Sequence, residues 1–208
     1  MGDTDRTFLI VGLGNPGRAY EATRHNVGFL VIDHLLPRWG VAGSPFRSKF
    51  GGEVAQVRRS GRSLLLLKPM GYMNLSGGPT SQVAQYYQVT QDRLVVICDD
   101  VNLPFGTLRI RAGGGPGGHN GLASIKEALG GDRFPRMRIG VGGGEPGRDL
   151  TGYVLGHFRP DEQRELPRVL ERCALAIETM LDRSLEVAMS QYNGSALEPT
   201  ADSAREGL

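Results

Sequence analysis

One histidine, one aspartate and three asparagines stand where apolar runs of the sequence end. The histidine is His25 of "TRHN", and Asp99 follows the apolar run "LVVIC". The asparagines are Asn15 of "GLGNPG", Asn74 of "YMNLSG" and Asn120 of "GGHNGL". A histidine serves as a general base, a carboxylate fixes its tautomer, and amides donate hydrogen bonds to a developing oxyanion. The set therefore predicts hydrolysis by an activated water, without a metal or a covalent nucleophile.

Taken singly, each of these residues has an ordinary structural explanation. A histidine near a helix start often caps the helix or is solvated, and aspartate and asparagine are common turn residues. The stretch "GGGPGGHNG" alone is equally typical of a flexible loop. What favours chemistry is the presence of all five residues at the ends of apolar elements.

Other catalytic and metal-binding patterns are missing from the sequence. There is no G-x-S-x-G elbow, no H-E-x-x-H pair and no Walker lysine loop. The remaining histidines, His34, His119 and His157, stand far apart in sequence, and Cys98 and Cys173 lie inside apolar patterns without ligand spacing. We therefore expect no metal and no cofactor, and two buried thiols of the kind found in a reducing compartment.

The glycines of residues 12–17 reproduce the dinucleotide fingerprint G-x-G-x-x-G. A nucleotide site of this kind requires a helix to begin inside the glycines, so that its first amides face the pyrophosphate. The following "RAYEATRH" has no apolar stripe, Pro16 lacks an amide hydrogen, and the acidic residue expected about 20 positions on is replaced by Asp33 inside a helical pattern. The motif therefore predicts a strand-to-loop turn that presents Asn15, and not a nucleotide-binding turn.

Strand and helix patterns alternate along the chain. Short β-rich runs occur at 8–11, 52–57, 63–68, 94–99, 107–111 and 137–141. Helical patterns cover about 26–38, 80–87, 120–129 and 161–182, and in the last of these Pro167 is expected to break or kink the first turns. The runs at 94–99 and 107–111 are too close for a crossover helix and should be antiparallel. The prediction is an α/β fold, a single domain with a twisted mixed β-sheet flanked by helices.

The size and composition agree with one domain. The 208 residues suffice to bury roughly 70% of the surface of the unfolded chain. We assign residues 1–192 to this domain and expect the polar "NGSALEPTADSAREGL" of 193–208 to be a disordered tail. The charged start "MGDTDRT" and the lack of any apolar run near ~18 residues predict a cytoplasmic protein without a membrane anchor.

Four blocks in the order "VGLGNPGRAYEATRHNVGF", "YMNLSG", "DDVNLPFG" and "GGGPGGHNGL" resemble the signature blocks of the bacterial-type peptidyl-tRNA hydrolases. The resemblance covers about residues 8–192. It implies a monomeric α/β domain that hydrolyses the ester between a nascent peptide and the terminal ribose of tRNA. It also implies that neither metal nor cofactor is needed and that the released tRNA returns to translation.

The resemblance assigns catalytic roles to three residues. His25 corresponds to the base that activates water, Asp99 to the partner that orients it, and Asn74 to the amide that holds the attacking water or the oxyanion. The sequence departs from the family at Asn102, where aspartate is common, and at Gly71, where a larger residue is common. Neither departure touches the expected base, so they bear on the preference of the groove and not on activity.

The same resemblance assigns the substrate contacts. Tyr20 and Met73 are expected to shape the peptide groove, and Asn15 and Asn120 to hold the C-terminal end of the peptide. All four residues lie in the signature blocks. The implied partner is peptidyl-tRNA, bound through its acceptor stem and terminal ribose.

A net charge of only +2 means that a polyanion must be held by a local basic patch. Arg109 and Arg111 alternate along "TLRIR" and so share one face of a strand, and "RMRIG" supplies Arg136 and Arg138. The resemblance implies that Arg109, Arg111 and Arg138 clamp the acceptor stem and its 5′-phosphate. Without it, a solvated strand face is an equally good explanation. Lys126, one turn into the helix after "GGHNGL", either extends this patch or is a solvated helix lysine, and we favour the second.

Two interpretations from other classes remain open at this point. The same fold occurs in plant organelle proteins that support splicing without catalysis, but the sequence shows no transit peptide. The glycine motif leaves a nucleotide-dependent oxidoreductase as the other alternative. Turnover of peptidyl-tRNA separates the first from an enzyme, and a thermal-shift scan with NAD and NADP tests the second.

Overall fold

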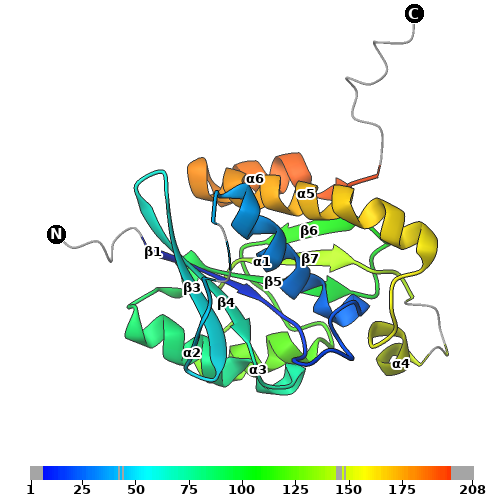
Figure 1. The fold of residues 1–208 in the computed structure, drawn as a ribbon, viewed down its shortest axis with the longest axis horizontal. Coiled ribbons are helices and arrows are strands. Elements are labelled where there is room, and N and C mark those ends of the chain that lie inside the picture. Colours follow the sequence, from blue (N-terminus) through cyan, green and yellow to red (C-terminus); the bar gives the residue numbers. More distant parts are fainter. Residues whose placement is uncertain (1–6, 42, 44, 144–146, 148, 198–208) are drawn as a thin grey trace, which may run out of the picture.

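The computed structural model describes residues 7–41, 43, 45–143, 147 and 149–197, which form one mixed sheet between two layers of helices (Figure 1). The strand order is β2-β3-β4-β1-β5-β7-β6-β8. Strands β4, β1, β5 and β7 are mutually parallel, and antiparallel strands flank them on both sides. The strands are β1 (Thr7–Gly12), β2 (Arg47–Lys49), β3 (Gly52–Arg59), β4 (Arg62–Pro69), β5 (Leu94–Asp100), β6 (Thr107–Arg111), β7 (Arg136–Gly140) and β8 (Gly194–Ser195). The predicted α/β class and mixed sheet are confirmed.

The helices cover both faces of the sheet. One face carries α1 (Val27–Arg38), α5 (Pro160–Asp182) and α6 (Leu185–Tyr192), and the other carries α2 (Gly77–Tyr86) and α3 (Asn120–Leu129). The short α4 (Leu150–Val154) precedes α5, and the 3-10 turns are η2 (Arg24–Asn26), η3 (Met73–Leu75) and η4 (Gln91–Arg93). Within the described part of the chain, no helix is both long and apolar enough to cross a membrane.

The buried strand β5 shows why the sequence forms two cores. Its residues alternate between the faces of the sheet, as the period of a strand requires. Val95 and Ile97 belong to the core under α1 and α5, whereas Val96 and Cys98 belong to the core over α2 and α3. Both cysteines are free and buried, as the sequence predicts.

The glycine-rich turn after β1 serves close packing. No helix begins inside it, since η2 starts only at Arg24. A Cβ on Gly12 would lie 2.3 Å from the carbonyl oxygen of Gly28, and a Cβ on Gly28 would lie 2.4 Å from the amide nitrogen of Leu13. The two glycines therefore let α1 lie directly against the end of β1, which confirms that the turn is not of the dinucleotide-binding kind.

Two details of the predicted elements differ from the structure. Strands β5 and β6 run in opposite directions as expected, but β7 lies between them. The expected break at Pro167 is wrong, because α5 continues over 23 residues with Pro167 inside it. Proline removes one intrahelical hydrogen bond, and here its ring is on the exposed side while Val169 and Cys173 of the same helix are buried in the core.

The end of the described chain also differs from the sequence prediction. Residues 193–197, expected to belong to a disordered tail, lie against β6. The side-chain oxygen of Asn193 accepts a 2.6 Å hydrogen bond from the amide of Ile110, and Gly194–Ser195 pair with Leu108 and Thr107. These bonds satisfy backbone groups on the edge of the sheet. Residues 198–208 lie outside the described residues.

Candidate functional site

A cavity of about 640 Å³ opens where the parallel strands end. The segments that follow the parallel strands β1, β4 and β5 meet at this edge, and the glycine-rich loop before α3 also reaches it. Open α/β sheets bind ligands at such edges. Leu150, Thr151 and Val154 of α4 form part of the cavity wall. The lining residues that matter for chemistry are Asn15, Tyr20, His25, Met73, Asn74, Asp99, His119, Asn120 and Arg138.

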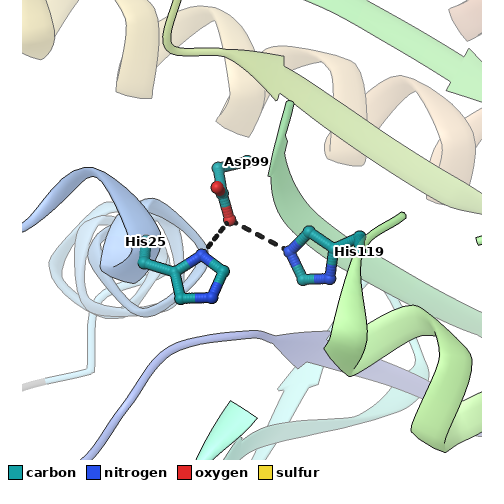
Figure 2. A group of neighbouring side chains, drawn as sticks. All are labelled: His25, Asp99 and His119. Atoms are coloured by element: carbon teal, nitrogen blue, oxygen red, sulfur yellow. Dashed lines mark hydrogen bonds and ion pairs between the residues drawn. The ribbon is translucent and has the colours of Figure 1, made fainter. Parts of the chain in front are cut away.

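At the base of the cavity, one carboxylate oxygen joins two histidines (Figure 2). His25 Nδ1 lies 2.8 Å and His119 Nε2 lies 3.0 Å from the same Oδ1 of Asp99. The side chains of His25, Asp99 and His119 are only 13%, 3% and 7% exposed. The distance between His25 and Asp99 is that of a charge-assisted hydrogen bond.

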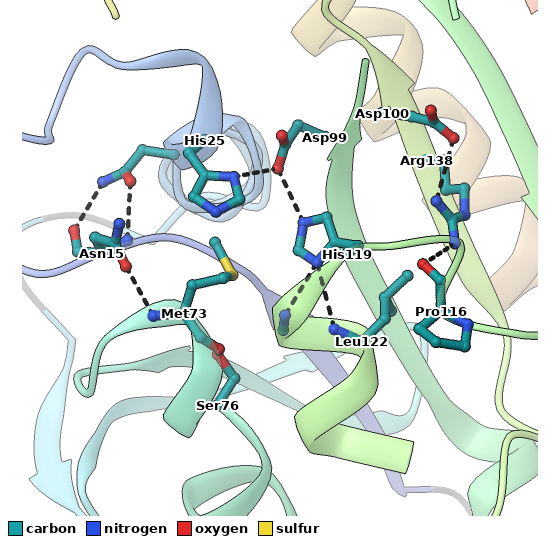
Figure 3. Close-up of polar contacts among 12 residues, drawn as sticks. Asn15, His25, Met73, Ser76, Asp99, Asp100, Pro116, His119, Leu122 and Arg138 are labelled. Carbon is teal, nitrogen blue, oxygen red and sulfur yellow. Dashed lines mark hydrogen bonds and ion pairs between the residues drawn. The ribbon is translucent and has the colours of Figure 1, made fainter. Parts of the chain in front are cut away.

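The tautomer of His119 follows from its other partners, and that of His25 from the charge of Asp99 (Figure 3). His119 is the N-cap of α3, and its Nδ1 accepts hydrogen bonds from the amides of Gly121 and Leu122 at 3.1 and 3.3 Å. Its Nε2 must therefore carry the hydrogen that it donates to Asp99. Burial would raise the pKa of Asp99, but His119 and His25 outweigh burial and hold the pKa well below its usual range. Asp99 is thus an anion that accepts two N–H groups, and Nε2 is the nitrogen of His25 left for a water.

Asn15 holds together the loops that carry the predicted residues. Its backbone amide and carbonyl each make a 2.9 Å hydrogen bond with the side chain of Asn26, the residue after His25. Its side-chain oxygen accepts a 2.8 Å bond from the amide of Met73. Asn15 is buried, so these bonds fix η2 and η3 relative to the end of β1. The neighbouring Asn74 is thereby placed at the cavity.

The other predicted substrate residues also line the cavity. Asn74 and Asn120 are exposed, and their side chains make no hydrogen bond to the residues that the structure describes. Their amides therefore remain available to a ligand. Met73, the residue before Asn74, is buried, and Tyr20, in the loop between β1 and η2, is half-buried.

Sequence reasoning missed His119. In the sequence it is one of three histidines that stand far apart and suggest no shared site, whereas the fold brings it together with His25 and Asp99. The available signal was its position directly before Asn120, at a helix start on the same edge of the sheet. A histidine at a helix start has the ordinary explanation of a cap, so its position alone did not mark it as part of the site.

His25, Asp99 and His119 are also the one group that could hold a metal ion among the residues described, since their ligand atoms lie within 4.8 Å of one another. In the arrangement described above, the two nitrogens that face Asp99 carry hydrogens, and a metal ligand needs a lone pair there. The geometry therefore suits hydrogen bonding better than coordination. Burial raises the pKa of the Cys98 thiol, which removes the adjacent cysteine as a nucleophile.

The predicted arginines lie on one face of β6 and β7, the face of α2 and α3. Arg109 stands opposite Arg138, and Arg111 opposite Arg136. Arg136 is buried and donates to the carbonyls of the loop beside it. Arg138 is half-buried, bonded to Asp100 at 3.2 Å and to the Pro116 carbonyl at 2.7 Å.

Arg109 and Arg111 are in a different situation from these two. Both are exposed, and neither makes an ion pair or hydrogen bond within the described ranges. Lys126, in contrast, is paired with Asp132 at 2.8 Å. The free basic groups of this face are therefore Arg109 and Arg111, while Arg138 also holds the glycine-rich loop.

Asn15 and Asn120 should respond differently to alanine. Asn15→Ala is expected to lower the melting temperature as well as raise KM, because it leaves the buried Met73 amide without its acceptor, a loss of about 1–3 kcal/mol. Asn120→Ala is expected to raise KM with no change in melting temperature. Thermal unfolding and steady-state kinetics of both variants test this pair. Equal stability of the two variants would contradict the structural role of Asn15.

Comparison with known proteins identifies the family of the chain. A family model described as peptidyl-tRNA hydrolase matches residues 9–200. Proteins named peptidyl-tRNA hydrolase from Gloeobacter violaceus and Frankia alni are 46% and 44% identical over 185 and 190 residues. These matches span 89% and 91% of this chain and 93% and 95% of the relatives. The crystal structure of peptidyl-tRNA hydrolase from Acinetobacter baumannii superposes with a TM-score of 0.82 at 33% identity, over 90% of this chain and 95% of that one. Since the match extends over nearly the whole of both partners, in sequence and in fold, the chain belongs to the peptidyl-tRNA hydrolase family.

Proposed function

We propose that this chain cleaves the ester between peptide and tRNA with a water that His25 activates, and that no metal takes part. The observation that carries the proposal is the bond from His25 Nδ1 to the buried Asp99 carboxylate, which leaves Nε2 of a cavity-lining ring as the proton acceptor. A base held in this way is suited to proton transfer, because its orientation and tautomer are fixed before the substrate binds.

The reaction proceeds in two steps. His25 Nε2 takes a proton from water while the water oxygen attacks the ester carbonyl carbon, and the imidazolium is stabilised by Asp99. The carbonyl oxygen becomes an oxyanion, to which the free amide of Asn74 donates. Collapse of the intermediate breaks the bond to the ribose oxygen, and that oxygen takes the proton back from Nε2. The products are a peptide with a free carboxyl group and tRNA with a free hydroxyl.

The order of strands gives the substrate a direction across the site. Arg109, Arg111 and Arg138 lie on β6 and β7 at one side of the cavity, and Tyr72 and Met73 follow β4 at the other side. The acceptor stem therefore lies toward β7 and β6, and the peptide lies toward the apolar residues after β4. We propose further that the chain acts as a monomer in the cytoplasm, where the translation to which it would return tRNA takes place.

Release of tRNA from an N-blocked aminoacyl-tRNA tests the activity. The purified chain is expected to release free tRNA with multiple turnovers. Binding of the substrate without release would instead identify a non-catalytic RNA-binding protein.

Arg111, one of the two free arginines of β6, should contribute to binding of tRNA and not to the chemical step. Arg111→Ala is expected to raise KM for peptidyl-tRNA with little change in kcat, since an exposed guanidinium binds phosphate through paired hydrogen bonds. The dependence of log binding constant on log salt should flatten by roughly 0.7–0.9 for each lost phosphate contact. Arg164→Ala on α5, across the sheet, is the matched control. An equal loss on a terminal aminoacyl-nucleotide that lacks the stem would contradict the assignment.

Removal of metal ions should leave the activity intact. Dialysis of the chain against a chelator is expected not to change kcat, because the facing nitrogens of His25 and His119 are occupied by hydrogens. The assay is run with substrate tRNA folded beforehand, so that magnesium effects on RNA are separated. Loss of activity that a single divalent ion restores to the protein would establish a metal site on these residues.

A further inference from the structure

A buried ion pair lies directly behind the expected base. The guanidinium of Arg24, the residue before His25, donates a 2.7 Å hydrogen bond to Oε2 of Glu162. The two side chains are 6% and 2% exposed, and they join η2 to the first turn of α5 across 138 residues of sequence. Moving two charges from water into the protein interior costs free energy that their attraction often does not recover. Stability alone therefore does not explain why a pair is buried at this position.

Arg24 also holds the chain that connects α4 to α5. Its Nη1 donates to the carbonyls of His157 at 2.7 Å and Tyr153 at 3.4 Å, and its guanidinium lies 4.2 Å from the centre of the Tyr153 ring. Its backbone amide donates to the carbonyl of Gly156 at 3.0 Å. The buried Nε has no hydrogen-bond partner among the residues described, a further cost that the site tolerates.

Glu162 serves two elements with one carboxylate. As the third residue of α5, it accepts the amide of Arg159 at 2.8 Å, which caps the helix. The same Oε2 accepts the bond from Arg24. The start of a 23-residue helix and the turn that carries His25 therefore share one anchor.

A second ion pair provides a comparison. It joins α1 to α5 at their C-terminal ends, away from η2. Arg38 ends α1, and its guanidinium makes two 2.9 Å bonds to Glu178 near the end of α5. These side chains are 28% and 16% exposed and do not line the cavity. Both pairs tie α1 or its leading turn to α5, but only the first is adjacent to the site.

We propose that Arg24 and Glu162 are positioning residues that hold His25 against Asp99 and fix the end of α4 as a wall of the cavity. The inference rests on the proposed role of His25 as the base. Arg24 and His25 are successive residues of a three-residue turn, so a shift of the guanidinium moves the backbone of His25 directly. A displacement of about 1 Å at a reacting group can cost 10²-fold in rate.

Matched substitutions on α5 test the proposal. Glu162→Gln keeps the shape and the cap oxygen but removes the charge, and Glu178→Gln makes the same change at the far pair. Both variants should have a lower melting temperature than the parent chain. Only Glu162→Gln should lower kcat, by at least 10-fold, with KM for an N-blocked aminoacyl-tRNA within threefold of the parent chain. Equal kcat values for the two variants would overturn the proposal.

A second measurement does not depend on activity. The proton shared by His25 Nδ1 and Asp99 should give a low-field resonance in the parent chain and in Glu178→Gln, and the signal should broaden or move in Glu162→Gln. If the parent chain shows this signal but releases no tRNA, the proposed function fails while the positioning role is still tested. An unchanged signal in Glu162→Gln contradicts positioning.

A double variant covers the case in which a lone buried charge prevents folding. Arg24→Met with Glu162→Met removes both charges, a replacement that is often neutral or stabilising. If the pair positions His25, this variant should fold, with a melting temperature lowered by the loss of the cap on the Arg159 amide and of the bond to the His157 carbonyl, and still show at least 10-fold lower kcat. Full activity in it would show that the pair serves stability only.

Discussion

Replacing His25 with alanine is expected to lower kcat by at least about 10²-fold, because general-base catalysis typically supplies 10²–10⁴. The variant should remain folded, since His25 is half-buried and its ring makes a single hydrogen bond, to Asp99, while His119 keeps its own bond to that carboxylate. Single-turnover release of tRNA measures the chemical step directly.

His34→Ala is the matched control for this variant. His34 lies farther along the chain, on α1, where its ring contacts Glu171 at 3.1 Å. It does not line the cavity. It should keep the parent kcat. A folded His25→Ala variant within 10-fold of the parent chain would remove His25 from the mechanism.

Asp99→Asn is expected to lower kcat by about 10-fold to 10²-fold, less than the loss of the base. The asparagine oxygen still accepts the N–H groups of the two histidines, but the charge that stabilises the imidazolium of His25 is gone. A hydrogen bond to a charged acceptor is roughly twice as strong as one to a neutral acceptor. A variant slower than His25→Ala would show that Asp99 does more than orient and stabilise.

Asp99→Asn should also change how the free energy of unfolding depends on pH. The pKa of Asp99 is lower in the folded chain than its usual value of about 3.9 in an unfolded one. The folded state therefore binds fewer protons than the unfolded state in acid, and the stability that the carboxylate contributes above pH ~4 is lost as the pH falls. Urea unfolding at pH 5 and pH 3 should show that Asp99→Asn loses less stability on acidification than the parent chain. An equal loss would contradict the assignment of an ionised, doubly bonded carboxylate.

The sequence was sufficient to predict the elements that position His25 and Asp99. The apolar run that forms β5 is buried on both faces, so its ends and its type can be recognised without a structure. The stripe of α1, which includes Val31 and Leu35, follows helical spacing in the same way. Because β1 and β5 are parallel neighbours, the residues that follow them meet at one edge, and this places two atoms 74 residues apart at 2.8 Å.

What could not be predicted depends on contacts between distant segments. His119 enters the site through a ring nitrogen that caps α3, and neither the cap nor the tautomer can be recognised from residue type. Pro167 is tolerated because other residues of α5 are buried against the sheet. Arg138 is in the same sequence pattern as Arg109, yet a bond to Asp100 and another to Pro116 give it structural partners, whereas Arg109 has none among the described residues.

The short strand β8 has a consequence for how the molecule behaves in concentrated solution. An open strand edge presents unpaired backbone groups that can recruit another chain and start aggregation. At one margin of this sheet, Gly194–Ser195 and the side chain of Asn193 occupy those groups of β6. At the other margin, the three-residue β2 carries the exposed charges of Arg47 and Lys49 and pairs only with Gly52–Val54, and the part of β3 beyond it ends in the charges of Arg58 and Arg59. One edge is thus covered and the other is charged, so neither offers a long apolar strand on which a second molecule could extend the sheet.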